Sequence, residues 1–344
     1  MNIIVTANIV PFMRGGADYH IEGVINQLRK HGHQVETIRF PFKFSPESDI
    51  QKLMDFCQNY DLSQPNGAQV DRVISLQFPA YGVKHPHHTV WLMHQHRAVY
   101  ELYEQQQIST ELKQLKKTIT AYDTQALKNT EQLYSNSQTV SARLKKYNQL
   151  DSTPLYHPPF SAEKFYCEQS QGYIFCPSRL ERLKRQDLLI LAAKYLKTPV
   201  KIIIAGDGGQ RQYYQQLIQE NNLEKRVRLV GMVSEAEKYA FYAHSLAVFF
   251  APYAEDYGYI TLEAMLSSKP VLSCDDSGGP LEFIQDQQTG YITETNPQQI
   301  ANKIDQLYEN QHLAESLGQQ GKAHYQNQNI SWDNVIKHLL KVME

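Results

Sequence analysis

The sequence predicts an α/β protein made of two doubly wound domains, each with a parallel sheet covered by helices on both faces. Short β-branched runs alternate with helical patterns along most of the 344 residues, as expected when parallel strands are joined by helices. A chain of this length suggests about two domains. A stretch rich in proline at 150–160 interrupts the alternation near the middle of the chain, and it is the best candidate for the interdomain linker.

The first half of the chain contains five predicted strands, at 2–9, 34–40, 72–76, 89–93 and 132–136. The segment 2–9 lacks a basic region before its apolar run and leads into a Gly-Gly turn, so we interpret it as the first strand and not as a signal peptide. A helix is predicted over 19–30, where His31 and Gly32 supply the stop signal.

The second half repeats the alternation, with strands at 173–176, 200–205, 228–230, 246–251, 271–274 and 290–292. Helices are predicted over 186–196, 211–221, 234–243 and 259–267. A last amphipathic helix is predicted over 331–343, with apolar residues Val335, Ile336, Leu339, Leu340 and Val342. Ligands of such sheets bind beyond the carboxyl ends of the strands, so we expect the two domains to face each other across a cleft.

Composition narrows the functional classes. The hydrophobic fraction of 42% is enough for packed cores, and the net charge of -2 gives no sign of nucleic-acid binding. The four cysteines form no Cys-x-x-Cys pair, which favours buried thiols in a reducing compartment. No apolar run reaches the ~20 residues needed to span a bilayer. We therefore expect a cytoplasmic protein.

The most informative segment is 255–263, in which Glu255 and Glu263 flank a glycine turn at Gly258. The turn is expected to open a helix, with Glu255 on the preceding loop and Glu263 in the second helical turn. A helix N-terminus attracts phosphate, and carboxylates accept hydrogen bonds from hydroxyls. The pattern therefore indicates a site for a sugar attached to a phosphate, and an ordinary glycine loop before an amphipathic helix is the alternative.

This segment resembles the Glu-x7-Glu motif of retaining glycosyltransferases with the GT-B fold, specifically glycosyltransferase family 4. Other motifs agree with the resemblance in order, at 15–18, 136–140, 178–184, 205–208 and 276–280. The resemblance implies an acceptor-binding Rossmann-like domain at 1–158 and a donor-binding Rossmann-like domain at 159–330. It also implies that the segment 331–344 packs as a helix back onto the first domain.

The same resemblance implies roles for particular residues. Arg179 and Lys184 would stabilise the leaving diphosphate, because its negative charge must be balanced by permanent positive charge. Glu263 would accept hydrogen bonds from the ribose, Glu255 would bind the hexose, and His94 would lie near the sugar ring. The remaining donor-binding residues are expected to be Gly15, Gly16, Gly206, Met232, Val233, Gly258, Tyr259, Ile260 and Thr261.

Three features depart from a simple assignment. Ser178 and Arg185 replace two glycines of the family pattern, which leaves the backbone path there open. His96 lies close to His94 and is the weaker candidate for the sugar site. The histidines at 85, 87 and 88 are attributed to a solvated loop, and no metal ion is expected there or at Asp276.

The expected activity is metal-independent transfer of a hexose from a UDP- or GDP-sugar to an acceptor hydroxyl, with no cofactor. The acceptor is expected to be a glycan or a lipid-linked glycan of bacterial surface polysaccharide, lipopolysaccharide or capsule assembly. Two alternatives stay open: a nucleotide-sugar 2-epimerase, and a non-catalytic protein that binds sugar nucleotides. Peripheral contact with the inner face of the cell membrane is a further hypothesis, based on Lys113, Lys116, Lys117, Arg143 and two lysines at 145–146.

Overall fold

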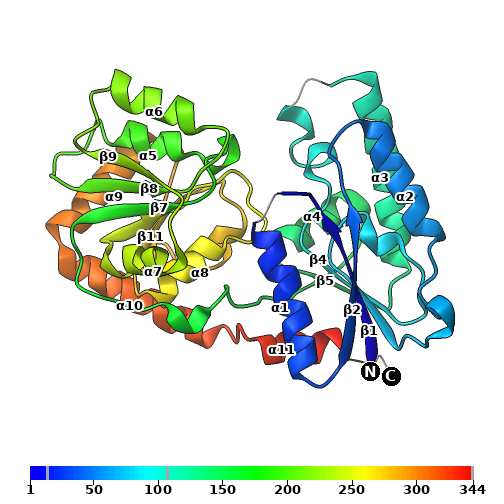
Figure 1. Ribbon diagram of the computed structural model, residues 1–344. Coiled ribbons are helices and arrows are strands. Elements are labelled where there is room, and N and C mark those ends of the chain that lie inside the picture. The colour runs from blue at the N-terminus through cyan, green and yellow to red at the C-terminus, as the bar shows by residue number, and fades with distance from the viewer. Residues whose placement is uncertain (13–14, 106–107, 342–344) are drawn as a thin grey trace. The chain divides into compact units, whose positions relative to one another are not determined.

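The computed structural model describes residues 1–12, 15–105 and 108–341, and the chain divides into two compact units. Unit 1 comprises Met1–His157 and Ser331–Glu344, and unit 2 comprises Pro158–Ile330. Each unit contains a six-stranded sheet in which all the paired strands are parallel, with helices on both faces (Figure 1). The predicted class, two doubly wound α/β domains, is confirmed.

The sheet of unit 1 has the order β2-β1-β3-β4-β5-β6. Its strands are β1 (Asn2–Ile9), β2 (Gln34–Pro41), β3 (Arg72–Ser75), β4 (His88–Leu92), β5 (Gln132–Ser135) and β6 (Thr153–Pro154). The strand order changes direction between β1 and β3, which pair in parallel. The carboxyl ends of these two strands therefore form the switch point of the first sheet.

The predicted linker at 150–160 is wrong in its first half. Thr153 and Pro154 form β6, which pairs with Tyr134 and Ser135 of β5 at the edge of the sheet. An edge strand tolerates proline because the missing N–H need not serve a further strand. The boundary between the two units falls after His157, inside the predicted stretch 150–160.

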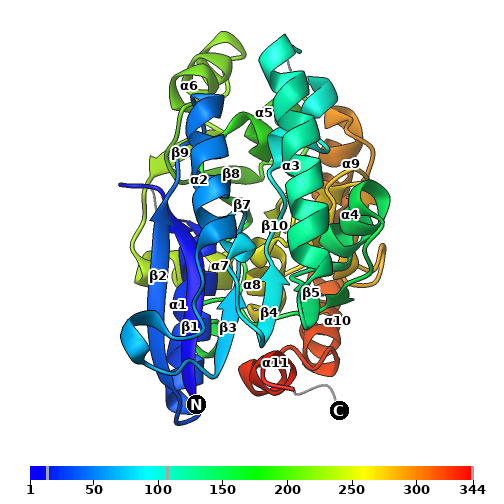
Figure 2. The same cartoon turned by 90° about the vertical axis from the view of Figure 1, so that its right-hand side faces the viewer.

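The helices of unit 1 are α1 (Gly16–Lys30), α2 (Glu47–Asn59), α3 (Thr110–Lys128), α4 (Gln138–Asn148) and α11 (Trp332–Leu339). Successive side chains of a strand point to opposite faces of the sheet, so alternate residues of β4 belong to different hydrophobic cores. Val90 and Leu92 join the core under α2, α3 and α4, whereas Trp91 joins the core under α1 and α11. Figure 2 shows α2 and α3 side by side over one face of this sheet.

The helix α11 packs against α1. Val335, Ile336 and Leu339 are buried in the same core as Val24 of α1. Gly23 makes the close approach possible, because a Cβ atom at that position would lie 2.4 Å from the Trp332 ring. The described helix ends at Leu339, and Val342 of the predicted helix lies outside the described residues.

The sheet of unit 2 has the order β12-β11-β10-β7-β8-β9. Its strands are β7 (Tyr173–Pro177), β8 (Lys201–Ala205), β9 (Val227–Gly231), β10 (Ala247–Phe249), β11 (Val271–Cys274) and β12 (Gly290–Thr293). Its helices are α5 (Gln186–Ala192), α6 (Arg211–Glu220), α7 (Glu235–His244), α8 (Tyr259–Leu266), α9 (Pro297–Glu309) and α10 (Gln311–Asn327). The strand order changes direction between β7 and β10, which form the switch point of this sheet.

Two hydrophobic cores flank the second sheet. Buried residues of α5, α6 and α9 pack on one face, and those of α7 and α8 pack on the other. After β11 the chain forms a 3-10 turn, η7 (Gly279–Glu282), in which Pro280 lies in the first turn. Within the described residues, no helix combines the length and the apolar character that crossing a bilayer requires.

Candidate functional site

The predicted donor residues of unit 2 gather at the switch point between β7 and β10. The segments that follow these two strands meet there, and the backbone N–H of Tyr253 donates to the carbonyl of Leu183 at 2.8 Å. Lys184, at the end of the 3-10 turn η6 (Arg182–Lys184), places its Nζ 2.7 Å from both carboxylate oxygens of Glu255. Their side chains are 15% and 19% exposed, so the ion pair is shielded but still reachable from solvent.

A second turn supports the Glu255 loop from the neighbouring strand β11. The N–H of Glu255 donates to the carbonyl of Ser277, and the N–H of Gly279 donates to the carbonyl of Glu255, both at 2.8 Å. Gly258 has φ +88°, and a Cβ atom there would lie 2.8 Å from Cγ of Pro280. The sequence 275–282 was predicted to lie beside the Glu255 loop, and these contacts confirm that proximity.

The helix α8 begins directly after Gly258, which has no side chain with which to cap it. The first N–H groups of a helix lack partners within the helix, so this end carries a partial positive charge. Glu263, one turn further on, is 8% exposed and accepts a hydrogen bond of 2.6 Å from the Tyr242 hydroxyl. Burial and the Glu263 carboxylate raise the pKa of Tyr242 well above its usual range, so Tyr242 remains a donor.

Arg185 occupies the position where the family pattern expected a glycine. Its φ of +52° lies in the left-handed region that favours glycine, so the backbone path is kept although the residue differs. The guanidinium donates to both oxygens of Asp276, at 2.8 and 2.6 Å, and to the carbonyls of Ala251 and Pro252. Sequence reasoning missed this clamp, which joins the start of α5 to the turn after β11.

Arg179 follows β7 and is exposed, and its carbonyl accepts a hydrogen bond of 2.9 Å from Nε2 of Gln186. Gly206 follows β8 with φ +130°, and a Cβ atom there would lie only 1.9 Å from the carbonyl oxygen of Ser178. Glycine is therefore required for the two loops to touch. Arg179 and Gly206 are thus brought together by backbone packing.

Met232 and Val233 follow β9. The side chain of Met232 is 76% exposed, whereas Val233 packs against the core beneath α7 and α8. Gly206 donates its N–H to the carbonyl of Gly231 at 2.8 Å, so the ends of β8 and β9 lie side by side. The predicted residues of unit 2 therefore all follow one edge of the sheet or belong to α8.

In unit 1, Gly15 precedes α1 as its N-cap residue. Its φ of -171° is extended backbone that any residue adopts, so the backbone conformation does not require glycine at this position. Nothing lies within 4 Å of a Cβ atom built there, which leaves open space before Gly16 and the helix. Asp18 accepts from the N–H of Gly15 at 3.1 Å and pairs with Arg39 at 2.7 Å.

His94 follows β4 and is partly buried. Its Nδ1 lies 2.7 Å from the carbonyl oxygen of Gln95, and because a carbonyl only accepts, Nδ1 is the donor of this hydrogen bond. The side chain of Gln95, 2% exposed, donates to Oδ1 of Asn148 and so anchors this loop to α4. His96 instead packs against Phe78 in an aromatic cluster, where burial lowers its pKa to about 4.

The histidines at 85, 87 and 88 were all expected on a solvated loop, but this is wrong for His88. His88 opens β4, is 5% exposed, and has its Nε2 2.7 Å from the Ser75 hydroxyl. Burial lowers the pKa of His88 to about 3. Within residues 1–12, 15–105 and 108–341, no group of three or more His, Cys, Asp or Glu side chains is arranged to hold a metal ion.

Solved structures of low sequence identity share this architecture along nearly the whole chain. Sucrose-phosphate synthase from Thermosynechococcus elongatus aligns with a TM-score of 0.78 at 17% identity, covering 98% of this chain and 97% of that one. The Anabaena protein HepE, in complex with UDP and glucose, aligns with a TM-score of 0.70 at 17% identity, covering 98% of each chain. At such identities the similarity establishes the fold alone. The protein therefore has the GT-B fold of two Rossmann-like units.

Sequence comparison finds similarity within unit 2. Residues 162–324 match the family model described as Glycosyl transferases group 1. A poly(ribitol-phosphate) alpha-N-acetylglucosaminyltransferase of Staphylococcus aureus is 35% identical over 162 residues, which are 46% of this chain and 32% of that protein. An alpha-1,3/1,6-mannosyltransferase of Mus musculus is 28% identical over 162 residues, 42% of this chain and 39% of that protein. The chain thus spans about a third of the length of these relatives.

Proposed function

We propose that this protein is a retaining, metal-independent glycosyltransferase that moves a hexose from a UDP- or GDP-sugar to an acceptor hydroxyl. The observation that carries the proposal is the ion pair of Lys184 and Glu255, which lies at the switch point of unit 2 and directly before the N-terminus of α8. A cation and a helix N-terminus suit a diphosphate, and the carboxylate suits sugar hydroxyls. Unit 2 would thus bind the donor and unit 1 the acceptor.

In this proposal Arg179, Lys184 and the backbone N–H groups of 258–260 oppose the diphosphate, whereas the N–H of Thr261 donates to the carbonyl of Gly258 at 3.0 Å. Tyr242 and Lys238 occupy two of the roughly four lone-pair positions of the Glu263 carboxylate. The remaining positions would accept hydrogen bonds from the ribose. Glu255 binds hexose hydroxyls once the phosphate approaches Lys184. The exposed Met232 and its neighbour Val233 support the base, and Gly206 lines the nucleotide side. Gly15 and Gly16 supply the open turn of unit 1.

The bond that breaks joins the anomeric carbon to the diphosphate oxygen, and the bond that forms joins the same carbon to the acceptor oxygen on the same face. The acceptor proton passes to the leaving phosphate, so no carboxylate nucleophile is needed. Charge on the diphosphate grows in the transition state, where fixed cations contribute most. His94, held by the hydrogen bond of its Nδ1 to the carbonyl of Gln95, would position the sugar ring.

The names of the similar proteins support a sugar-transfer reaction on a glycan-type acceptor. They include an N-acetylglucosaminyltransferase that acts on poly(ribitol-phosphate) and a mannosyltransferase, and HepE was solved with UDP and glucose. We therefore propose that the protein acts in surface polysaccharide, lipopolysaccharide or capsule assembly. UDP-sugars are the first donors to test, with GDP-sugars as the second set.

The test begins with calorimetry against UDP and GDP, followed by incubation of the matching nucleotide sugar with glycan acceptors. An α-linked product from an α-linked donor, formed equally well in EDTA, is the expected result. Lys184→Ala should lower the turnover rate more than the donor affinity, whereas Arg182→Ala, an exposed neighbour, should change neither. Conversion of the free donor to its 2-epimer would establish an epimerase instead, and tight binding without any turnover would establish a binding protein.

A further inference from the structure

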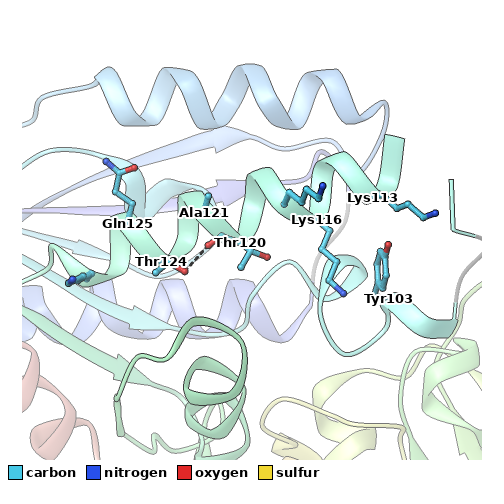
Figure 3. A pocket seen from close by; sticks show the side chains of 9 residues that line it. Tyr103, Lys113, Lys116, Thr120, Ala121, Thr124 and Gln125 are labelled. Carbon is cyan, nitrogen blue, oxygen red and sulfur yellow. Dashed lines mark hydrogen bonds between the residues drawn. The ribbon is translucent and has the colours of Figure 1, made fainter. Parts of the chain in front are cut away.

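A groove runs along the exposed side of α3 in unit 1. It has a volume of about 830 Å³, and its lining includes Lys113, Lys116, Lys117, Ala121 and Lys128, together with Tyr103 of the 3-10 turn η4 (Tyr103–Gln105). Figure 3 shows Lys113 and Lys116 at the same end of this helix as Tyr103. The groove thus combines four positive charges with aliphatic and aromatic surface.

The nearby acidic residues Asp123, Glu104 and Glu111 do not neutralise the lysines of the groove. Asp123 is fully buried on the inner side of α3, where it accepts hydrogen bonds from Tyr81 at 2.6 Å and Tyr100 at 2.7 Å. Glu104 and Glu111 are exposed but do not line the groove. In the described part of the chain, no carboxylate forms an ion pair with Lys113, Lys116, Lys117 or Lys128. The positive charge therefore faces outward.

The basic surface is smaller than the sequence suggested. Arg143 is only 9% exposed, and its guanidinium lies 3.3 Å from the carboxylate of Glu101, so its inclusion in an exposed basic face was wrong. Lys145 pairs with Asp151 at 2.8 Å. The positive charge available to an anionic partner therefore lies mainly on the lysines of α3.

The uncharged parts of the groove are as informative as its charges. Nζ of Lys116 lies 3.6 Å from the centre of the Tyr103 ring, and Ala121 lies exposed between the lysines. A lysine side chain has an apolar stem with a charged tip, which suits it to the boundary between lipid head groups and acyl chains. A dissolved polyanion would use the ammonium groups and leave this apolar surface unmatched.

We propose that the α3 groove docks the protein reversibly on the surface of an anionic phospholipid bilayer. The ammonium groups would contact head-group phosphates, while the lysine stems and the exposed Ala121 would lie at the level of the glycerol backbone, above the buried Tyr103. Each lysine near such a surface is expected to change the partition coefficient about fivefold. Binding should weaken with salt, because the Debye length falls to about 10 Å at 0.1 M ionic strength. Docking is independent of the proposed transfer reaction.

The experiment is co-sedimentation of the full chain with vesicles of phosphatidylglycerol and phosphatidylcholine in equal parts, compared with vesicles of phosphatidylcholine alone. The test variant replaces Lys113, Lys117 and Lys128 by Gln, which favours helix and keeps the side chain polar. The matched control replaces Lys194, Lys197 and Lys225 by Gln, which removes the same charge from exposed positions of unit 2. A single change, Ala121→Glu, places a negative charge in the centre of the groove.

We expect the wild type and the control to bind the anionic vesicles at low salt and to bind neutral vesicles poorly. The triple variant should partition about a hundredfold less, and Ala121→Glu should also weaken binding, while calorimetry with UDP or GDP stays unchanged in all four proteins. Equal retention on both kinds of vesicle, or equal binding by the test and control variants, would overturn the proposal. Retention on dextran sulfate that depends on the same lysines, with none on vesicles, would overturn it in favour of a soluble anionic glycan.

Discussion

At the scale of single residues, Arg185 shows how one side chain can replace a glycine without changing the backbone. Its left-handed conformation costs about 1 to 2 kcal/mol for a residue with a Cβ atom. The four hydrogen bonds of its guanidinium, two of them to Asp276, hold it there. The cost of the conformation is thus met by the contacts that fix the turn beside Glu255.

Removing the carboxylate should expose this dependence. Asp276→Ala leaves Arg185 with its two carbonyl partners only, and we expect the free energy of unfolding to fall by about 1 to 2 kcal/mol, since both partners are partly exposed. Urea unfolding followed by circular dichroism measures the change. Asp275→Ala, at the exposed neighbouring position, is the control and should have little effect. Equal stability of the two variants would show that the clamp contributes nothing.

Glu263 is the residue whose substitution should affect the donor most selectively. Glu263→Gln keeps an oxygen that can accept from Tyr242 but loses the charge, so we expect donor binding to weaken by about 1 to 3 kcal/mol with the fold intact. Calorimetry with the nucleotide diphosphate measures it. The control is Glu235→Gln, because Glu235 is the other carboxylate paired with Lys238, at 3.0 Å compared with 3.5 Å for Glu263. Unchanged affinity in Glu263→Gln would remove this residue from the proposed site.

At the scale of elements, Asp123 ties α3 to Tyr81 and Tyr100 in the interior of unit 1. Burial raises the pKa of this carboxyl group from 3.8 to about 7, although the two tyrosine hydrogen bonds act in the opposite direction. The unfolded chain releases the proton near pH 4, whereas the folded protein keeps it until about pH 7. The contribution of Asp123 to stability is therefore complete below pH 4 and is lost as the pH rises toward 7.

Asp123→Asn cannot titrate, so it should remove this pH dependence. Between pH 4.5 and 7, the free energy of unfolding of the wild type should fall relative to the variant by at most about 1.4 kcal/mol per pH unit. Urea midpoints of both proteins across this range provide the measurement, with Asp55→Asn on the exposed side of α2 as the control. Parallel curves for wild type and Asp123→Asn would rule out a perturbed carboxyl group.

Features that depend on neighbouring residues in the sequence could be predicted, whereas those that depend on tertiary contacts could not. Long β-branched runs predict buried parallel strands, because both faces of such a strand are covered. The edge strand β6 escaped prediction, since proline normally interrupts a strand and only its place at the edge makes it acceptable. Lys184 and Glu255 were found through the order of the motifs. The pairing of Arg185 with Asp276 was not, because the two residues lie 91 positions apart and only tertiary structure joins them.

At the scale of the whole molecule, the two units have different spectroscopic signals. Both tryptophans, Trp91 and Trp332, belong to unit 1, and Trp91 is fully buried. Tryptophan fluorescence therefore reports the unfolding of unit 1, whereas circular dichroism reports both units. The proposed donor residues, except for those of unit 1 near Gly15 and His94, lie in unit 2.

We expect a nucleotide diphosphate to stabilise unit 2 selectively. At a ligand concentration of 100 times the dissociation constant, the gain is about 2.7 kcal/mol. Thermal unfolding by circular dichroism should then shift upward, while the fluorescence transition stays near its value without ligand. Adenosine diphosphate, which carries the same diphosphate on a different base, is the control for recognition of the base. Equal shifts of both transitions would show that the nucleotide engages both units or that they unfold together.

The interrupted course of unit 1 has a consequence for how the chain is made. A ribosome completes residues 1–157, then all of unit 2, and only afterwards the segment 331–341 that supplies α11. Until then, the surface of α1 around Gly23 and Val24 that receives Trp332 and its apolar neighbours stays uncovered. Unit 2 is contiguous and has all its own residues earlier, so the half of the protein that is synthesised first is the half that finishes folding last.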